Sequence, residues 1–321
     1  MITKDIQVNC SIVERFNSLD SSGRLAHAYL FVGPAYIGKT ETALSIAKMF
    51  CCEAKPTAGQ LFCGQCSSCK KADSSCHPDI NFINSDFGEQ IKIEQIRELL
   101  AQVRLRPFMA KKKIFIIKNV ENITLEGSNA LLKTQEEPVG DSLLILTTSV
   151  PEKNLDTIRS RCQIVRFLSE TKQDLAEHIR THYKEDEITS QYFAYFAEGC
   201  FGKARLLQEK KWFEKKNEII DGFLFKGWND DSIKKVLEDK EQVKEVLDVL
   251  LSCIRDCMLI KHGIGQNSLI NVDRKEDLKG FADRFSFDEL VAINGEIIKT
   301  CKLLSENLNL KIPISVIKEM L

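Results

Sequence analysis

The chain has 321 residues, of which 43% are hydrophobic and 28% are charged, and its formal net charge is −1. This composition is typical of a globular protein that buries a sizeable core in two or three domains. The near-neutral charge argues against a free-standing nucleic-acid binder, which usually carries a basic surplus. No apolar run is long enough to span a membrane, and residues 1–5 do not begin a signal peptide. We therefore expect a cytoplasmic protein without a membrane partner.

Residues 33–40 match the pattern G-x-x-x-x-G-K-[ST]. They follow an apolar run at 28–32, a predicted strand, and precede a predicted helix at 41–50. In such a P-loop, backbone N–H groups surround phosphate oxygens at a helix N-terminus. The lysine would reach the β and γ phosphates of ATP or ADP, and the next hydroxyl would bind magnesium. The residues expected to bind nucleotide here are Gly33, Gly38, Lys39 and Thr40.

The segment at about 51–77 is rich in cysteine and contains two overlapping C-x-x-C units. Thiolates at this spacing can bind one tetrahedral zinc ion if a further ligand comes from elsewhere. The predicted ligands are Cys52, Cys63, Cys66 and Cys69. Cys51 and Cys76 remain alternatives for the fourth ligand. Since four thiolates close the coordination shell and leave no position for water, we expect the zinc to be structural.

A continuous apolar strand is predicted at 114–117, and the residues that follow it are unusual for a P-loop protein. In P-loop ATPases the corresponding strand ends in acidic residues that hold magnesium and orient water. Lys118 and Asn119 occupy these positions here, and neither can act as a carboxylate ligand or as a general base. Glu121 follows three positions too late for the strand tip. We therefore expect no useful ATP hydrolysis by this chain.

The remaining elements of the first half alternate between strand and helix. They are a strand at 79–83, a helix at 94–105, a helix at 129–138 that ends at Pro138, and strands at 142–148 and 163–167. This alternation predicts an α/β domain with a parallel sheet and helices on both faces.

Several of these segments together resemble one family. They are residues 26–31, the P-loop, the cysteine module, residues 129–138 and Ser160-Arg161-Cys162. Their order is similar to that of the AAA+ clamp-loader subunits of bacterial DNA polymerase III. The resemblance implies that Arg161 is an arginine finger for the ATP site of a neighbouring subunit, and that Thr148 occupies the nucleotide-sensing position. A planar, permanently charged guanidinium suits such a role, because it can neutralise charge on the γ-phosphoryl group.

Two departures from the ATP-hydrolysing members of the family are informative. Gly202 falls where those members carry a lid arginine, and Lys118 and Asn119 replace their acidic pair. The pattern resembles members that complete a neighbour's site. The implied partners are gamma/tau-like ATPase and delta-like subunits and, through the complex, the sliding clamp and primed DNA.

One alternative is an active, gamma/tau-like ATPase that uses Glu121. Another is a zinc module that recognises nucleic acid directly, which the near-neutral charge disfavours.

The second half of the chain is predicted to be helical throughout. We expect an AAA+ domain at 1–168 with the zinc-binding insertion, an all-α lid at 169–207 and an all-α collar domain at 208–321. Residues 307–314 resemble the C-terminal signature of clamp-loader collar domains. Amphipathic helices with unfilled apolar faces suit a domain that oligomerises.

Overall fold

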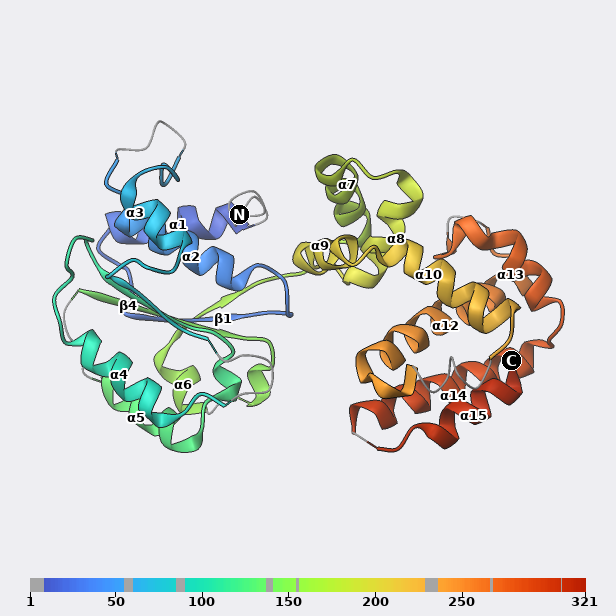
Figure 1. The fold of residues 1–321 in the computed structure, drawn as a ribbon. Helices are drawn as coiled ribbons and strands as arrows, with labels where there is room; N and C mark the ends of the chain where they lie inside the picture. Colours follow the sequence, from blue (N-terminus) through green and yellow to red (C-terminus); the bar gives the residue numbers. More distant parts are fainter. Residues whose placement is uncertain are drawn as a thin grey trace. The chain divides into compact units, whose positions relative to one another are not determined.

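The structure, a computed structural model, describes residues 9–54, 60–84, 90–136, 141–153, 156–228, 236–265, 268–306 and 308–321. The chain forms two compact units (Figure 1). Unit 1 contains residues 1–170 and 199–203, and unit 2 contains residues 171–198 and 204–321. The finer division into lid and collar remains a prediction. Across the described ranges, no helix has the length and apolar character needed to cross a membrane.

A five-stranded parallel sheet forms the centre of unit 1, as the sequence predicts. Its strands are β1 (Ala28–Val32), β2 (Ile80–Ile83), β3 (Lys113–Ile117), β4 (Ser142–Thr148) and β5 (Gln163–Arg166). Their spatial order is β2-β3-β4-β1-β5, and every neighbouring pair is parallel. All carboxyl ends therefore meet at one edge, where ligands bind in open α/β sheets.

Helices cover both faces of this sheet (Figure 1). One face carries α1 (Cys10–Ser21), α2 (Lys39–Cys51) and α3 (Ser67–Asp73), and the other carries α4 (Ile93–Val103), α5 (Leu125–Glu136) and α6 (Asp156–Arg161). Successive residues of a strand point to opposite faces. Phe31 of β1 accordingly packs in the cluster with Phe16 and Ile46, whereas Leu30 joins the other cluster with Ile96. Both faces are apolar because both are buried.

Unit 2 is all-helical. Its helices are α7 (Lys172–Tyr183), α8 (Glu187–Ala197), α9 (Phe201–Glu209, which begins in unit 1), α10 (Trp212–Ile220), α12 (Lys240–Lys261), α13 (Lys275–Ala282), α14 (Phe287–Ser305) and α15 (Lys311–Met320). The local sequence determines where several of these helices begin. The Asp186 side chain accepts from the Thr189 N–H at the start of α8, and Ser286 forms a capping box with Glu289 at the start of α14.

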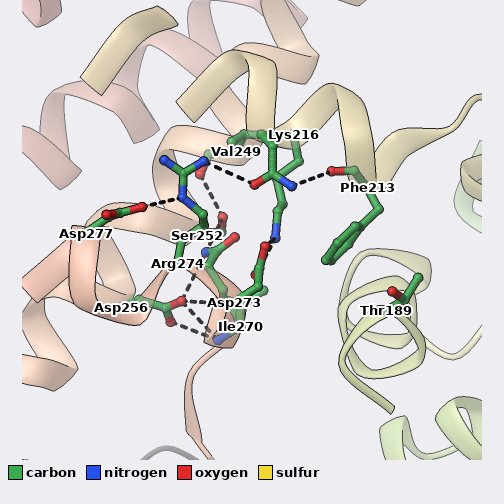
Figure 2. A network of polar contacts seen from close by, with 12 residues as sticks. Thr189, Phe213, Lys216, Val249, Ser252, Asp256, Ile270, Asp273, Arg274 and Asp277 are labelled. Carbon is green, nitrogen blue, oxygen red and sulfur yellow. Dashed lines mark hydrogen bonds and ion pairs between the residues drawn. The ribbon is translucent and has the colours of Figure 1, made fainter. Parts of the chain in front are cut away.

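Buried charges fix the segment that precedes α13 (Figure 2). The Lys216 ammonium of α10 lies 2.6 and 2.8 Å from the two carboxylate oxygens of Asp273, and 4.1 Å from the ring centre of Phe213. The buried Asp256 carboxylate of α12 accepts the backbone N–H groups of Ile270 and Asn271. The segment is thus held in place by hydrogen bonds from its backbone and by an ion pair inside the unit.

Candidate functional site

The P-loop connects β1 to α2 at the carboxyl edge of the sheet. Gly38 has a φ of +91°, a conformation that glycine adopts without a steric penalty, and α2 begins at the next residue. Gly33 donates its N–H to the Thr148 carbonyl oxygen of β4 at 3.3 Å. A Cβ at Gly33 would lie 2.8 Å from Phe167, so a side chain does not fit there. Both glycines of the motif thus allow a backbone geometry that a side chain would prevent.

The Lys39 ammonium lies inside this loop. It donates to the carbonyl oxygens of Gly33 and Pro34 at 2.6 Å each and to Ser149 Oγ at 3.1 Å. Burial lowers its pKa to about 8, although the negative charge of Glu121 opposes this shift. The ammonium is therefore held inside the loop by two of the loop's own carbonyl oxygens and by Ser149.

The two predicted hydroxyl residues differ in their surroundings. Thr40 is half-buried in the first turn of α2, next to Lys39. Thr148 is fully buried at the end of β4, and its Oγ1 accepts the N–H of Val150 at 3.1 Å. The Thr148 hydroxyl thus takes part in the turn that follows its strand.

Glu121 lies closer to the site than its sequence position suggests. Asn119 adopts a left-handed conformation with φ 55°, and a short 3-10 turn, η2 (Val120–Asn122), follows it. This turn places Glu121 Oε1 3.2 Å from the backbone nitrogen of Ser149, the residue whose hydroxyl binds Lys39. Sequence reasoning missed this contact; the tolerance of asparagine for the left-handed region was the available signal.

Gly202, in the first turn of α9, contacts the P-loop directly. Its N–H donates to the Tyr36 carbonyl oxygen at 3.2 Å, and a Cβ on Gly202 would lie 2.5 Å from that oxygen. Any side chain here would displace the loop backbone. An arginine, which the resemblance implies at this position in the hydrolysing members of the family, would therefore not fit here.

Arg161 lies at the opposite edge of the sheet from the P-loop. It is the last residue of α6, and its Nη1 donates to the Thr157 carbonyl oxygen at 3.1 Å. The next strand, β5, starts at Gln163, which is aligned with Tyr29 of β1. The P-loop begins four residues after Tyr29, which corresponds to about 13 Å along a strand. Arg161 is therefore remote from the phosphate loop of its own chain.

The four predicted zinc ligands lie together. The sulfur atoms of Cys52, Cys63, Cys66 and Cys69 are all within 4.8 Å of one another. Four thiolates bound to zinc at about 2.3 Å have sulfur–sulfur distances near 3.8 Å, so the group is close to the required size. Within the part of the chain that the structure describes, the alternative ligands Cys51 and Cys76 do not belong to this group.

Backbone N–H groups surround these sulfurs. Gln65 and Cys66 donate to Cys63 Sγ at 3.4 and 3.3 Å, and they lower the pKa of Cys63. Burial raises the pKa of the Cys66 thiol, but hydrogen bonds outweigh this and bring it to about 6. Burial raises the pKa of Cys69 and Cys52, and a cation would offset that cost. The donor set therefore fits a closed, structural zinc site.

A buried polar chain connects the cysteine module to the sheet. The Asp79 backbone N–H donates to His77 Nδ1 at 3.1 Å, so the ring proton resides on Nε2, which lies 2.7 Å from Ser68 Oγ. The Asp79 carboxylate accepts three N–H groups from residues 108–110 at 2.7–2.9 Å. His77 thus takes part in packing and does not belong to the four-cysteine group.

Comparisons with known proteins agree with this architecture. The family "DNA polymerase III, delta subunit" matches residues 8–171, and the family "DNA polymerase III, delta subunit, C terminal" matches residues 212–315. Similar curated proteins include DNA polymerase III subunit delta' of Bacillus subtilis, 39% identical over 47% of this chain and 45% of that protein. The delta' subunit of Pseudomonas aeruginosa is 34% identical over 46% of this chain and 44% of that protein. The chain therefore matches less than half the length of these relatives.

A solved structure with a similar course is a DNA polymerase III gamma subunit-related protein of Thermotoga maritima. It has 18% sequence identity and a TM-score of 0.46, and the match covers 95% of this chain and 97% of that chain.

The parallel sheet, the P-loop and the four-cysteine group define an AAA+ P-loop module with a cysteine insertion and an all-helical C-terminal part. The chain belongs to the DNA polymerase III delta-subunit family, and its similar curated relatives include delta' subunits. The resemblance to bacterial clamp-loader subunits is confirmed at this level.

Proposed function

We propose that this chain is a delta-prime-type clamp-loader subunit that donates Arg161 to the ATP site of a neighbouring subunit. The observation that carries the proposal is the position of Arg161 at the sheet edge remote from its own P-loop. A guanidinium there lies too far from the P-loop of its own chain to complete that site, so the site that we propose it completes is that of a second molecule. An arginine supplied in trans stabilises charge on the transferring phosphoryl group.

The P-loop itself supports nucleotide binding more than hydrolysis. Lys39 and Thr40 are in place, whereas Lys118 and Asn119 stand where a strand-tip carboxylate would hold magnesium. The close contact of Gly202 with Tyr36 leaves no space for a lid arginine. The chain then acts as a fixed partner in the assembly, with gamma/tau-like and delta-like subunits, during ATP-driven loading of the sliding clamp onto primed DNA in the cytoplasm. The four-cysteine group binds a structural zinc ion.

A second candidate is an ATP-hydrolysing, gamma/tau-like subunit. The proximity of Glu121 to Ser149, and through it to Lys39, favours this alternative, because it brings one carboxylate into the phosphate site. Glu121 Oε1 is already engaged by a backbone N–H. We therefore rank this candidate second.

The test is ATP turnover by the complex reconstituted with its gamma/tau-like and delta-like partners, the clamp and primed DNA. Arg161→Ala should leave assembly intact and reduce turnover at the completed site by about 10³-fold. The complex then loses that site's share of total turnover. Arg161→Lys should stay impaired, since lysine lacks the planar fork. The matched control is Arg159→Ala, which removes an exposed arginine of the same helix. Equal turnover by Arg161→Ala and the unaltered complex contradicts the proposal.

A further inference from the structure

A carboxylate oxygen of Glu121 lies near the P-loop. Neither the P-loop motif nor the strand-tip positions 118 and 119 predict it. Glu121 Oε1 accepts the Ser149 N–H at 3.2 Å, whereas Oε2 is buried and has no hydrogen-bond partner within the described part of the chain. A buried carboxylate oxygen without a donor or cation is costly. The nearby Lys39 ammonium attracts this carboxylate through space, but the hydrogen bonds of Lys39 go to Gly33, Pro34 and Ser149.

The backbone holds this oxygen at a defined place. The left-handed Asn119 and the turn η2 return the chain to the carboxyl edge of the sheet, and the Asn119 N–H donates to Thr147 Oγ1 at 3.2 Å. Glu121 is thereby fixed against the residue that follows β4, next to the strand that leads into the P-loop. The usual strand-tip acid would come from position 118 or 119, where the chain has lysine and asparagine.

We propose that Glu121 supplies the carboxylate for the divalent cation that accompanies a nucleotide at this P-loop. Magnesium in such sites is bound through one or two carboxylates together with substrate phosphates, and carboxylate oxygens are its preferred protein ligands. Glu121 Oε2 supplies such an oxygen, directly or through a metal-bound water. This inference rests on the proposed binding of nucleotide by the P-loop.

If Glu121 had a purely electrostatic role, its removal would change the affinity for nucleotide in the opposite direction. If Glu121 only balances the charge of Lys39, its removal strengthens the attraction of the loop for phosphate, whether or not magnesium is present. If Glu121 only shapes the loop, its removal weakens both kinds of binding equally. Only if Glu121 is a ligand of the cation does its removal change nucleotide binding in a way that depends on the metal.

The experiment measures equilibrium binding of a non-hydrolysable ATP analogue to the full chain, once with Mg²⁺ and once with EDTA. Glu121→Gln should weaken binding about 10-fold with Mg²⁺ and leave it unchanged or tighter with EDTA. Glu121→Asp, which keeps the charge, should retain part of the Mg²⁺ dependence. Glu98→Gln, at an exposed position of α4, is the matched control and should bind as the unaltered protein does.

Each other outcome overturns the proposal. Equal weakening of Glu121→Gln in Mg²⁺ and EDTA assigns the residue to loop structure, and equal strengthening assigns it to charge balance. Lys39→Ala separates the two levels of inference, because it should abolish binding under both conditions. If the unaltered chain binds no analogue at all, nucleotide binding by the P-loop fails as well. Far-UV circular dichroism and thermal unfolding verify that Glu121→Gln and Glu121→Asp are folded.

Discussion

At the scale of single residues, Asp79 shows how one buried charge supports a functional unit. It is fully buried, and its carboxylate accepts the N–H groups of Phe108, Met109 and Ala110. Burial alone would raise its pKa, but these three donors outweigh burial and hold the pKa below 3.8, its ordinary value. The ionised form is thus the one that the fold stabilises.

This shift predicts an acid-sensitive contribution to stability. Because the pKa is depressed in the folded state, the contribution is present above about pH 4 and is lost as pH falls through the folded pKa. Asp79→Asn should lower the free energy of unfolding by about 1–3 kcal/mol at pH 7, since an amide N–H then faces a backbone N–H. Its unfolding free energy should also fall less steeply below pH 4 than that of the unaltered protein.

Urea unfolding at pH 7 and at pH 3 checks both points. Asp141→Asn, which changes an exposed aspartate of the same unit, is the control and should match the unaltered protein. If the unfolding free energy of Asp79→Asn falls between pH 7 and pH 3 as much as that of the unaltered protein, the prediction is wrong.

At the scale of elements, the cysteine module joins the end of α2 to the start of α3. Cys52 is the C-cap residue that follows α2, and Cys66 caps α3 by accepting the Cys69 N–H. Away from the sulfurs, the buried Lys48 of α2 pairs with Asp73 of α3. The ion pair, the four-sulfur group and the Ser68–His77 contact hold the module, and α3 has only seven residues. We expect its order to depend on the metal.

Single serine substitutions test this expectation. The unaltered chain and Cys76→Ser should each bind about one zinc ion, since Cys76 is exposed and outside the sulfur group. Cys52→Ser should lose most of the metal, because three thiolates leave the shell incomplete. Metal analysis gives the stoichiometry, and hydrogen exchange should show lost protection in α3 but not in α4. Retention of zinc by Cys52→Ser, with loss in Cys76→Ser, would reverse the ligand assignment.

For the molecule as a whole, the two features on which the proposed function depends lie at different edges of one sheet. The P-loop occupies the carboxyl edge, and Arg161 precedes β5 at the amino edge. The proposed nucleotide site and the proposed arginine finger thus lie at opposite edges of the sheet. Neither role requires the chain to hydrolyse ATP.

The isolated chain should accordingly show no ATP turnover above background, and Lys39→Ala should not change that result. Turnover should appear on addition of the gamma/tau-like partner. Steady-state phosphate release, alone and after mixing, measures both. Turnover by the isolated chain that disappears in Lys39→Ala would establish the hydrolysing alternative. It would also mean that the expectation from Lys118 and Asn119 is wrong.

The sequence by itself determined the features that depend on local spacing. Alternating apolar strands and helices predicted the parallel sheet, because burial on both faces requires continuous apolar strands. The P-loop pattern located the phosphate loop between β1 and α2. The spacing of Cys63, Cys66 and Cys69 indicated one sulfur group, since three thiols within seven residues are held close by a single turn and helix start.

The residues that meet these features from distant parts of the chain are set by the arrangement of the strands and helices. Lys39 and Ser149 are 110 positions apart, and strand order brings them together. The left-handed Asn119 brings Glu121 to Ser149, and asparagine permits this conformation without requiring it. The contact of Gly202 with the P-loop likewise depends on where α9 begins in space. Such contacts depend on how separate elements are placed, whereas spacing along the chain constrains only neighbours within one element.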